Sequence, residues 1–141
     1  MTTISERIVV DAGERQYELV RGWGELPSGW VWGQVGAVAV DSKDNVHVFT
    51  RAEHPYLVFD KTGKLLDSWG EGVFEDAHGL CITPDDTLYF VDRDPQVVLK
   101  FDKTGRHRLT LGHRHKPSDT AIRRKRANPL DHSPPVAASP C

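Results

Sequence analysis

The chain repeats the stretch GAVAVDSKDNVHVFTRAEHPYLVFDKTGKLLDSWG (residues 36–70) as HGLCITPDDTLYFVDRDPQVVLKFDKTGRHRLTLG (residues 78–112). The alignment has no gap, so Gly36 corresponds to His78. Each later residue of the first copy corresponds to the residue 42 positions further along the chain, and this shift is the repeat offset. Nine of the 35 aligned positions are identical, whereas typical residue frequencies of a few per cent predict about two identities by chance. The two stretches are therefore two copies of one structural unit.

Each copy is predicted to form four short antiparallel strands. Apolar residues recur at every second position in VAV and VHV of the first copy and in LCI and LYF of the second, which is the periodicity of a β-strand. DSKDN and TPDDT supply turn residues between these runs, and the shared DKTG supplies a glycine for a later hairpin turn. Four antiparallel strands in each copy match a β-propeller blade, a unit of roughly 40 to 50 residues.

We therefore expect an all-β fold, a partial β-propeller of about two blades with one extra strand. Residues 1–35 contain YELVRGWG, which repeats the pattern of KLLDSWG and predicts the fourth strand of a neighbouring blade, followed by a Trp- and Gly-rich loop. The two blades are expected over residues 36–77 and 78–112. Propeller rings need roughly four to eight blades, so about two blades cannot close a ring alone.

The remaining residues, 113–141, differ in composition from those before them. All twelve aromatic residues lie before residue 113, and five of the nine prolines lie after it. The net charge is −6 over residues 1–112 (12 Lys and Arg, 18 Asp and Glu) and +4 over residues 113–141 (6 and 2). We expect a basic, Pro-rich, disordered tail. The abrupt change of pattern is what a reading-frame shift or a truncated gene would produce.

Composition also narrows the location and the partners. The acidic body argues against nucleic-acid binding, which depends on neutralising phosphates. No stretch approaches the roughly 18 apolar residues of a membrane span, and the start MTTISERIVVDAG lacks the apolar core of a secretory signal. We expect a cytoplasmic protein with no membrane partner.

His78 is the most informative single residue by position. It opens the second copy where the first copy has Gly36, which places an imidazole at the start of an innermost strand, facing the central channel of a propeller. Spacing alone leaves a structural loop histidine as the alternative.

The chain from about Tyr17 to Thr120 resembles NHL repeats. It is more narrowly similar to the opening blades of bacterial proteins related to peptidyl-α-hydroxyglycine α-amidating lyase, through the two copies quoted above and the motifs RAEH and AHGL within them. In that family a six-bladed propeller holds a zinc ion through three histidines and a structural calcium ion in its channel. The family converts a peptidyl-α-hydroxyglycine into a peptide amide and glyoxylate.

The resemblance implies four site residues. His78 matches the first zinc histidine, although Ala77 precedes it where the family has proline. Val38 and Leu80 match the residues whose backbone carbonyls hold calcium, and Arg51 of RAEH matches the active-site arginine.

The resemblance also implies an incomplete site. The family's other two zinc histidines and its catalytic tyrosine belong to later blades, and a catalytic zinc needs about three protein ligands. The resemblance implies zinc and calcium for a complete parent with a small peptide-like substrate, whereas we expect this chain to bind zinc weakly or not at all and to be inactive alone. The alternative is a non-catalytic module that binds a protein or carbohydrate, or that assembles with copies of itself through exposed blade edges.

Overall fold

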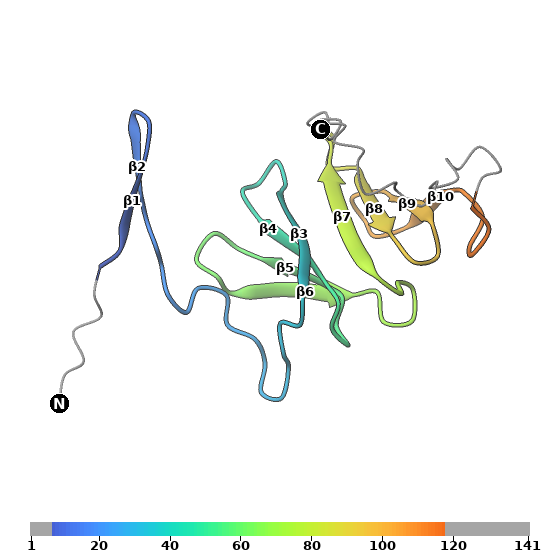
Figure 1. Ribbon diagram of the computed structural model, residues 1–141, viewed down its shortest axis with the longest axis horizontal. Coiled ribbons are helices and arrows are strands. Elements are labelled where there is room, and N and C mark those ends of the chain that lie inside the picture. Colours follow the sequence, from blue (N-terminus) through green and yellow to red (C-terminus); the bar gives the residue numbers. More distant parts are fainter. Residues whose placement is uncertain (1–6, 118–141) are drawn as a thin grey trace, which may run out of the picture.

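The computed structural model describes residues 7–117. They contain ten strands and no helix, arranged as antiparallel sheets of two, four and four strands (Figure 1). The all-β class predicted from the repeat is confirmed. No helix in the described part of the chain could span a membrane. Most of the predicted tail, residues 118–141, lies outside the described residues.

Each copy of the repeat forms one four-stranded sheet, in which consecutive strands are neighbours. The first sheet contains β3 (Val35–Val40), β4 (Val46–Thr50), β5 (Tyr56–Phe59) and β6 (Leu65–Trp69). The second sheet contains β7 (Ala77–Ile82), β8 (Leu88–Asp92), β9 (Val97–Phe101) and β10 (His107–Leu111). β7 and β8 begin at the positions that correspond to the starts of β3 and β4, so the repeat offset of the sequence is also that of the structure.

The shared DKTG forms the same turn in both sheets. Asp60 Oδ1 accepts hydrogen bonds from the backbone N–H of Thr62 (2.8 Å) and Lys64 (3.1 Å) and from the Thr62 hydroxyl (2.6 Å). Asp102 makes the equivalent three bonds in the second sheet. Gly63 has a φ of 91°, a backbone conformation that residues with a side chain rarely adopt. These bonds account for the aspartate and the threonine that the two turns share.

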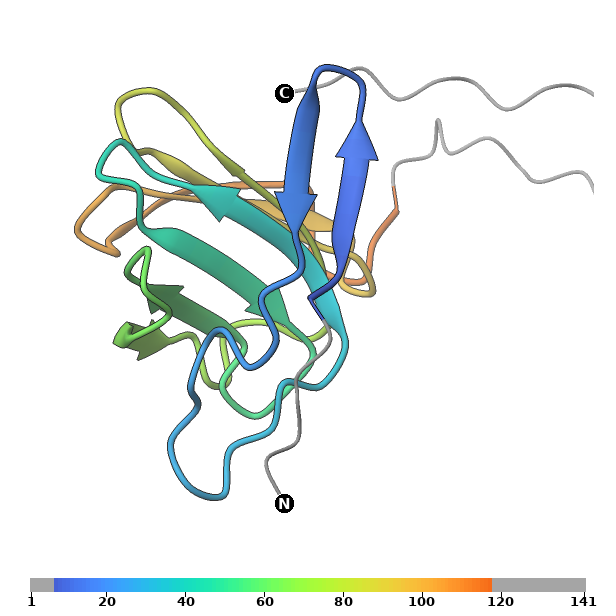
Figure 2. The ribbon, with the colours of Figure 1, turned by 90° about the vertical axis from the view of Figure 1, so that its left-hand side faces the viewer.

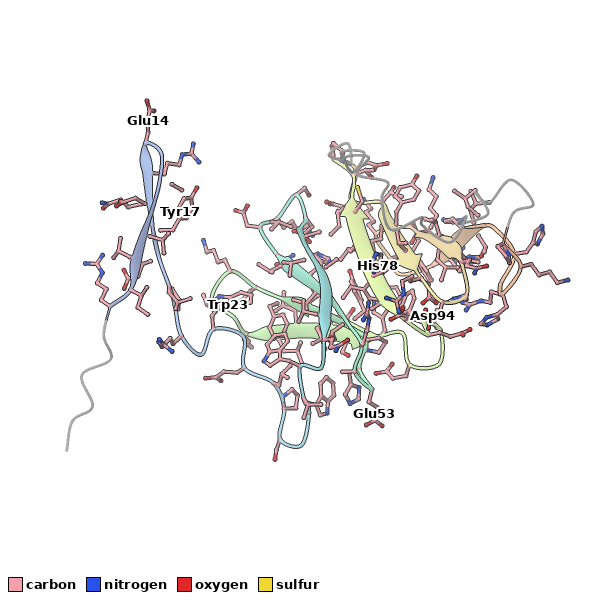
Figure 3. The ribbon with its side chains drawn as sticks, viewed as in Figure 1. Glu14, Tyr17, Trp23, Glu53, His78 and Asp94 are labelled. Carbon is pink, nitrogen blue, oxygen red and sulfur yellow. The ribbon has the colours of Figure 1, made fainter. Side chains whose placement is uncertain are left out.

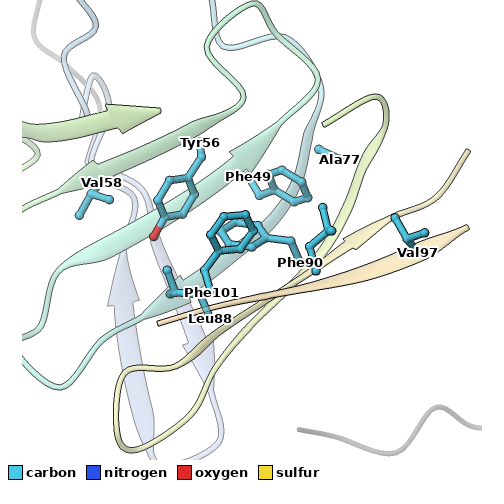
Figure 4. Packing of buried hydrophobic residues seen from close by; sticks show 9 residues of the cluster. Phe49, Tyr56, Val58, Ala77, Leu88, Phe90, Val97 and Phe101 are labelled. Carbon is cyan, nitrogen blue, oxygen red and sulfur yellow. The ribbon is translucent and has the colours of Figure 1, made fainter. Parts of the chain in front are cut away.

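The main core lies between the two sheets. Alternate residues of β4 and β5 point at alternate residues of β8 and β9, and Phe90 stands at the centre with no exposed surface (Figure 4). Its ring centroid lies 5.0 Å from those of Phe49 and Tyr56 and 4.8 Å from that of Phe74. The sheets are therefore held together mainly by burial of aromatic side chains.

The other face of the first sheet is covered by the Trp-rich loop. Trp23 packs on Phe59 with ring centroids 5.6 Å apart, just as Trp69 packs on Phe101, the counterpart of Phe59 in the second copy, at 5.0 Å. The loop thus occupies the place that the end of β6 occupies on the second sheet. The residues packed against this face include Trp23, Leu26, Trp30 and Trp32.

The N-terminal segment differs from the predicted single strand. β1 (Val9–Ala12) and β2 (Arg15–Glu18) form a local hairpin, and residues 19–24 of YELVRGWG form no strand. Neither strand of the hairpin contacts another described strand. Figure 1 shows the hairpin standing apart, and Figure 2 views the sheets from its side. β2 pairs with β1 because β1 is its neighbour in the sequence and Gly13, with a φ of 65°, forms the turn between them.

Candidate functional site

The candidate site lies where the first strands of the two sheets meet. β3 and β7 are edge strands of their own sheets and lie side by side (Figure 1). A Cβ on Gly36 would lie 2.5 Å from the carbonyl oxygen of Ala77 and 3.3 Å from Cα of His78. Only glycine allows two backbones to approach this closely.

A buried carboxylate joins two arginines at this junction. Asp76, the residue before β7, lies 2.5 Å from Nε of Arg51 and 2.6 Å from Nε of Arg93. The Asp76 side chain is 8% exposed, whereas the two guanidinium side chains are 29% and 52% exposed. Arg51 follows β4 and Arg93 follows β8, so they are equivalent residues of the two copies. The pairing holds both arginines at one end of the sheets.

Arg51 also reaches the backbone beside His78. Its Nε donates a hydrogen bond to the carbonyl of Ala77 (3.0 Å), and its Nη1 donates to Oε1 of Gln34 (3.0 Å). The carbonyl of Ala77 belongs to the peptide unit that leads into His78. Arg51 of the first sheet therefore contacts the backbone next to His78 of the second sheet.

Asp92 fixes the segment that carries Asp76. Its side chain has no exposed surface and accepts hydrogen bonds from the backbone N–H of Asp76 (2.7 Å) and Glu75 (3.1 Å). Thr50, its counterpart in the first sheet, donates to the backbone carbonyls of Trp32 and, at 3.1 Å, Gln34. In both sheets, the residue that ends the second strand therefore forms hydrogen bonds with the segment that precedes the first strand and holds it in place.

The remaining predicted residues make fewer contacts. His78 is exposed on β7 (Figure 3), and its side chain has no hydrogen bond or ion pair with another described residue. Val38 is exposed on β3, whereas Leu80 is half-buried and packs against the core.

The metal ions implied by the resemblance are not accommodated by these residues alone. Residues 7–117 contain no group of three or more His, Cys, Asp or Glu side chains that could hold a metal ion. One imidazole falls short of the three ligands of a catalytic zinc, and two backbone carbonyls fall short of the six to eight oxygens of calcium. Zinc and calcium stay predictions.

The chemistry available at the junction is recognition of an anion. A guanidinium carries five N–H donors in a planar fork, and the bonds above use Nε and Nη1 of Arg51. The pKa of Asp94 is lowered, first by its hydrogen bond with Arg93, as expected beside a cation. A carboxylate could take the remaining donors of the exposed guanidinium groups.

Asp76 and Arg93 are site residues that the sequence analysis did not select. The identity of Arg51 and Arg93 at the repeat offset was a usable signal for the second arginine. Comparison with protein-family models and with curated proteins finds no match. The resemblance to NHL repeats therefore stays a prediction.

Proposed function

We propose that the two four-stranded sheets are neighbouring blades of a β-propeller of the amidating-lyase type, and that the chain contributes Arg51 and His78 to a channel site. The observation that carries this proposal is the bond from Arg51, of the first sheet, to the Ala77 carbonyl beside His78 of the second. It supports one site built from two blades, at the ends of the innermost strands.

Arg51 would bind the substrate through charge. A peptidyl-α-hydroxyglycine ends in a carboxylate, which suits a partly exposed guanidinium. In the lyase reaction the hydroxyl gives up its proton, its oxygen becomes the carbonyl oxygen of glyoxylate, and the C–N bond breaks as the amide nitrogen is protonated. Arg51 would hold the carboxylate in one orientation during this step. The ion pair with the buried Asp76 would hold the Arg51 guanidinium in position.

A second observation supports the propeller and also the alternative, an assembly module. Val91, Leu109 and Leu111 are exposed on the far face of the second sheet. Their counterparts in the first sheet, at the repeat offset, are Phe49, Asp67 and Trp69, which belong to the face turned toward the second sheet. A further sheet would pack on this apolar face in the same way.

The test follows glyoxylate release from a peptidyl-α-hydroxyglycine while light scattering reports the mass of the protein. His78 alone supplies too few ligands for zinc, so release is expected only from an assembled species that contains zinc. His78→Ala and Arg51→Lys should abolish release, and Glu53→Gln, on the exposed loop after β4, should not. Assembly without zinc or release would favour the binding module. Release that survives His78→Ala would refute the proposed site.

A further inference from the structure

A cavity of about 830 Å³ opens between the two sheets, and its lining includes the turn between β3 and β4, at the end of the strands away from Arg51, as well as Trp69 and Gly70 at the end of β6. Tyr56 and Trp69 of the first sheet and Leu88 and Phe101 of the second form part of its wall. Cavities of roughly 300 to 1,000 Å³ with apolar walls and a few polar groups are typical of small-molecule sites.

A buried chain of hydrogen bonds forms the polar side of this cavity. His47 Nδ1 is hydrogen-bonded to the Tyr56 hydroxyl, and His47 Nε2 lies 3.1 Å from Oδ2 of Asp41. The exposed fractions of His47 and Tyr56 are 7% and 1%. All three residues line the cavity.

The Asp41 end of this chain is negatively charged. Burial raises the pKa of Asp41, but hydrogen bonds from Asn45 and His47 outweigh it and the pKa falls to about 2. The carboxylate is therefore ionised and acts as an acceptor for Nε2 of His47. Burial, then the charges of Asp67 and Asp41, raise the pKa of Tyr56, which stays a phenol.

One carboxylate in the lining of the cavity lies outside this buried chain of hydrogen bonds. Asp67, an exposed carboxylate on β6, also lines the cavity, and among the described residues no Lys or Arg lies within ion-pair distance of it. The aromatic ring of Trp69 stands two residues further along the same strand.

We propose that this cavity binds a small aromatic primary amine. The ammonium group donates hydrogen bonds to the Asp67 carboxylate, and the ring of the ligand packs against Trp69 and Phe101. This site is separate from the junction of Arg51 and His78 and does not depend on the lyase proposal.

Two lysines set a competing preference that the experiment must address. Lys43 and Lys103 are exposed and also line the cavity, and their charges would favour an anion of the same shape. Phenethylamine, 2-phenylethanol and 3-phenylpropanoate are close in size and differ in charge. They therefore separate recognition by Asp67 from recognition by the lysines and from burial of the ring alone.

The test is an NMR titration of the full chain with these three compounds, following the indole N–H of Trp69 and the amides of Gly70 and Gly105, which line the cavity. Phenethylamine should shift these signals at lower concentration than the other two. Asp67→Asn should weaken its binding about tenfold, the effect of losing one charged hydrogen bond. Glu53→Gln removes the same charge on the exposed loop after β4 and should leave binding unchanged.

Three results would overturn the proposal. They are tighter binding of 3-phenylpropanoate, equal binding of phenethylamine to Asp67→Asn and the wild-type chain, and no shift of these signals with phenethylamine. Because Asp67 is exposed and its carboxylate bonds the N–H of the adjacent Ser68, the variant should keep the fold. Unchanged chemical shifts of core residues in the free protein would verify that it does.

Discussion

Gly36→Ala tests the close approach of β3 and β7, on which the candidate site depends. The new methyl carbon would lie 2.5 Å from the carbonyl oxygen and 2.9 Å from the carbonyl carbon of Ala77, whereas ordinary van der Waals contact begins at 3.4 Å. Both atoms are backbone, so no side chain can rotate away. The two strands must separate by roughly an ångström or the chain must bend locally.

Two opposing effects decide how much Gly36→Ala changes the free energy of unfolding. Overpacking of this kind costs about 1 to 3 kcal/mol. Gly36 does not have a positive φ, so alanine fits the backbone and, by restricting the unfolded chain, should stabilise by about 0.4 to 1 kcal/mol. We expect a net loss of about 1 to 2 kcal/mol in the free energy of unfolding. If β3 and β7 did not approach this closely, Gly36→Ala would instead raise the free energy of unfolding.

Urea unfolding measures this free energy, with an unchanged m-value as the sign that only stability has changed. Gly79→Ala is the matched control, because its Cβ would meet the Val91 side chain at 3.2 Å and that side chain is partly exposed and can yield. Gly36→Ala should unfold at lower urea than Gly79→Ala and should shift the amide signals of Ala77 and His78. An equal or higher midpoint for Gly36→Ala would refute the packing of β3 on β7.

Three further predictions concern the core and the buried polar chain. Phe90→Ala should lower the free energy of unfolding by about 3 to 5 kcal/mol, because a wholly buried ring is lost; a loss below about 1 kcal/mol would contradict the aromatic core. Tyr56→Phe should cost about 1 to 3 kcal/mol, because Nδ1 of buried His47 loses its partner; equal urea midpoints would contradict this. Folding lowers the pKa of Asp41 from 3.8 to about 2, so its contribution is present above pH 3.8 and is lost as the pH falls through 2. Asp41→Asn should therefore flatten the acid side of a stability–pH curve, and a curve as steep as that of the wild-type chain would exclude this role.

The strands of the two sheets could be predicted from local patterns. Alternating apolar residues and the turns DSKDN, TPDDT and DKTG are signals within a few residues of one another, and the structure places strands and turns there. Asp60 and Asp102 illustrate why this works, since each hydrogen-bonds to residues two and four positions later. The N-terminal segment was less predictable, because YELVRGWG could pair with a distant sheet or with the nearby strand β1.

The candidate site could be predicted only in part. Arg51 and His78 were selected through the resemblance, and the structure brings the Arg51 guanidinium to the peptide unit before His78. Asp76 carried no sequence signal, because its role depends on two arginines that lie far from it along the chain, one before it and one after it. The hydrogen bonds that join Asp41, His47 and Tyr56 could not be predicted either. In a strand with alternating apolar residues, nothing in the local sequence indicates which partner a histidine will have.

By itself the sequence determined the all-β class, the repeat, the turns and the alternation of faces, because each depends on residues close together in the chain. The tertiary structure decided which faces meet. It set the first sheet against the second, the Trp-rich loop over the outer face of the first sheet, and Gly36 against Ala77. Burial and ion pairing act through space, so the partners of Asp76 and Tyr56 exist only once the two sheets have packed.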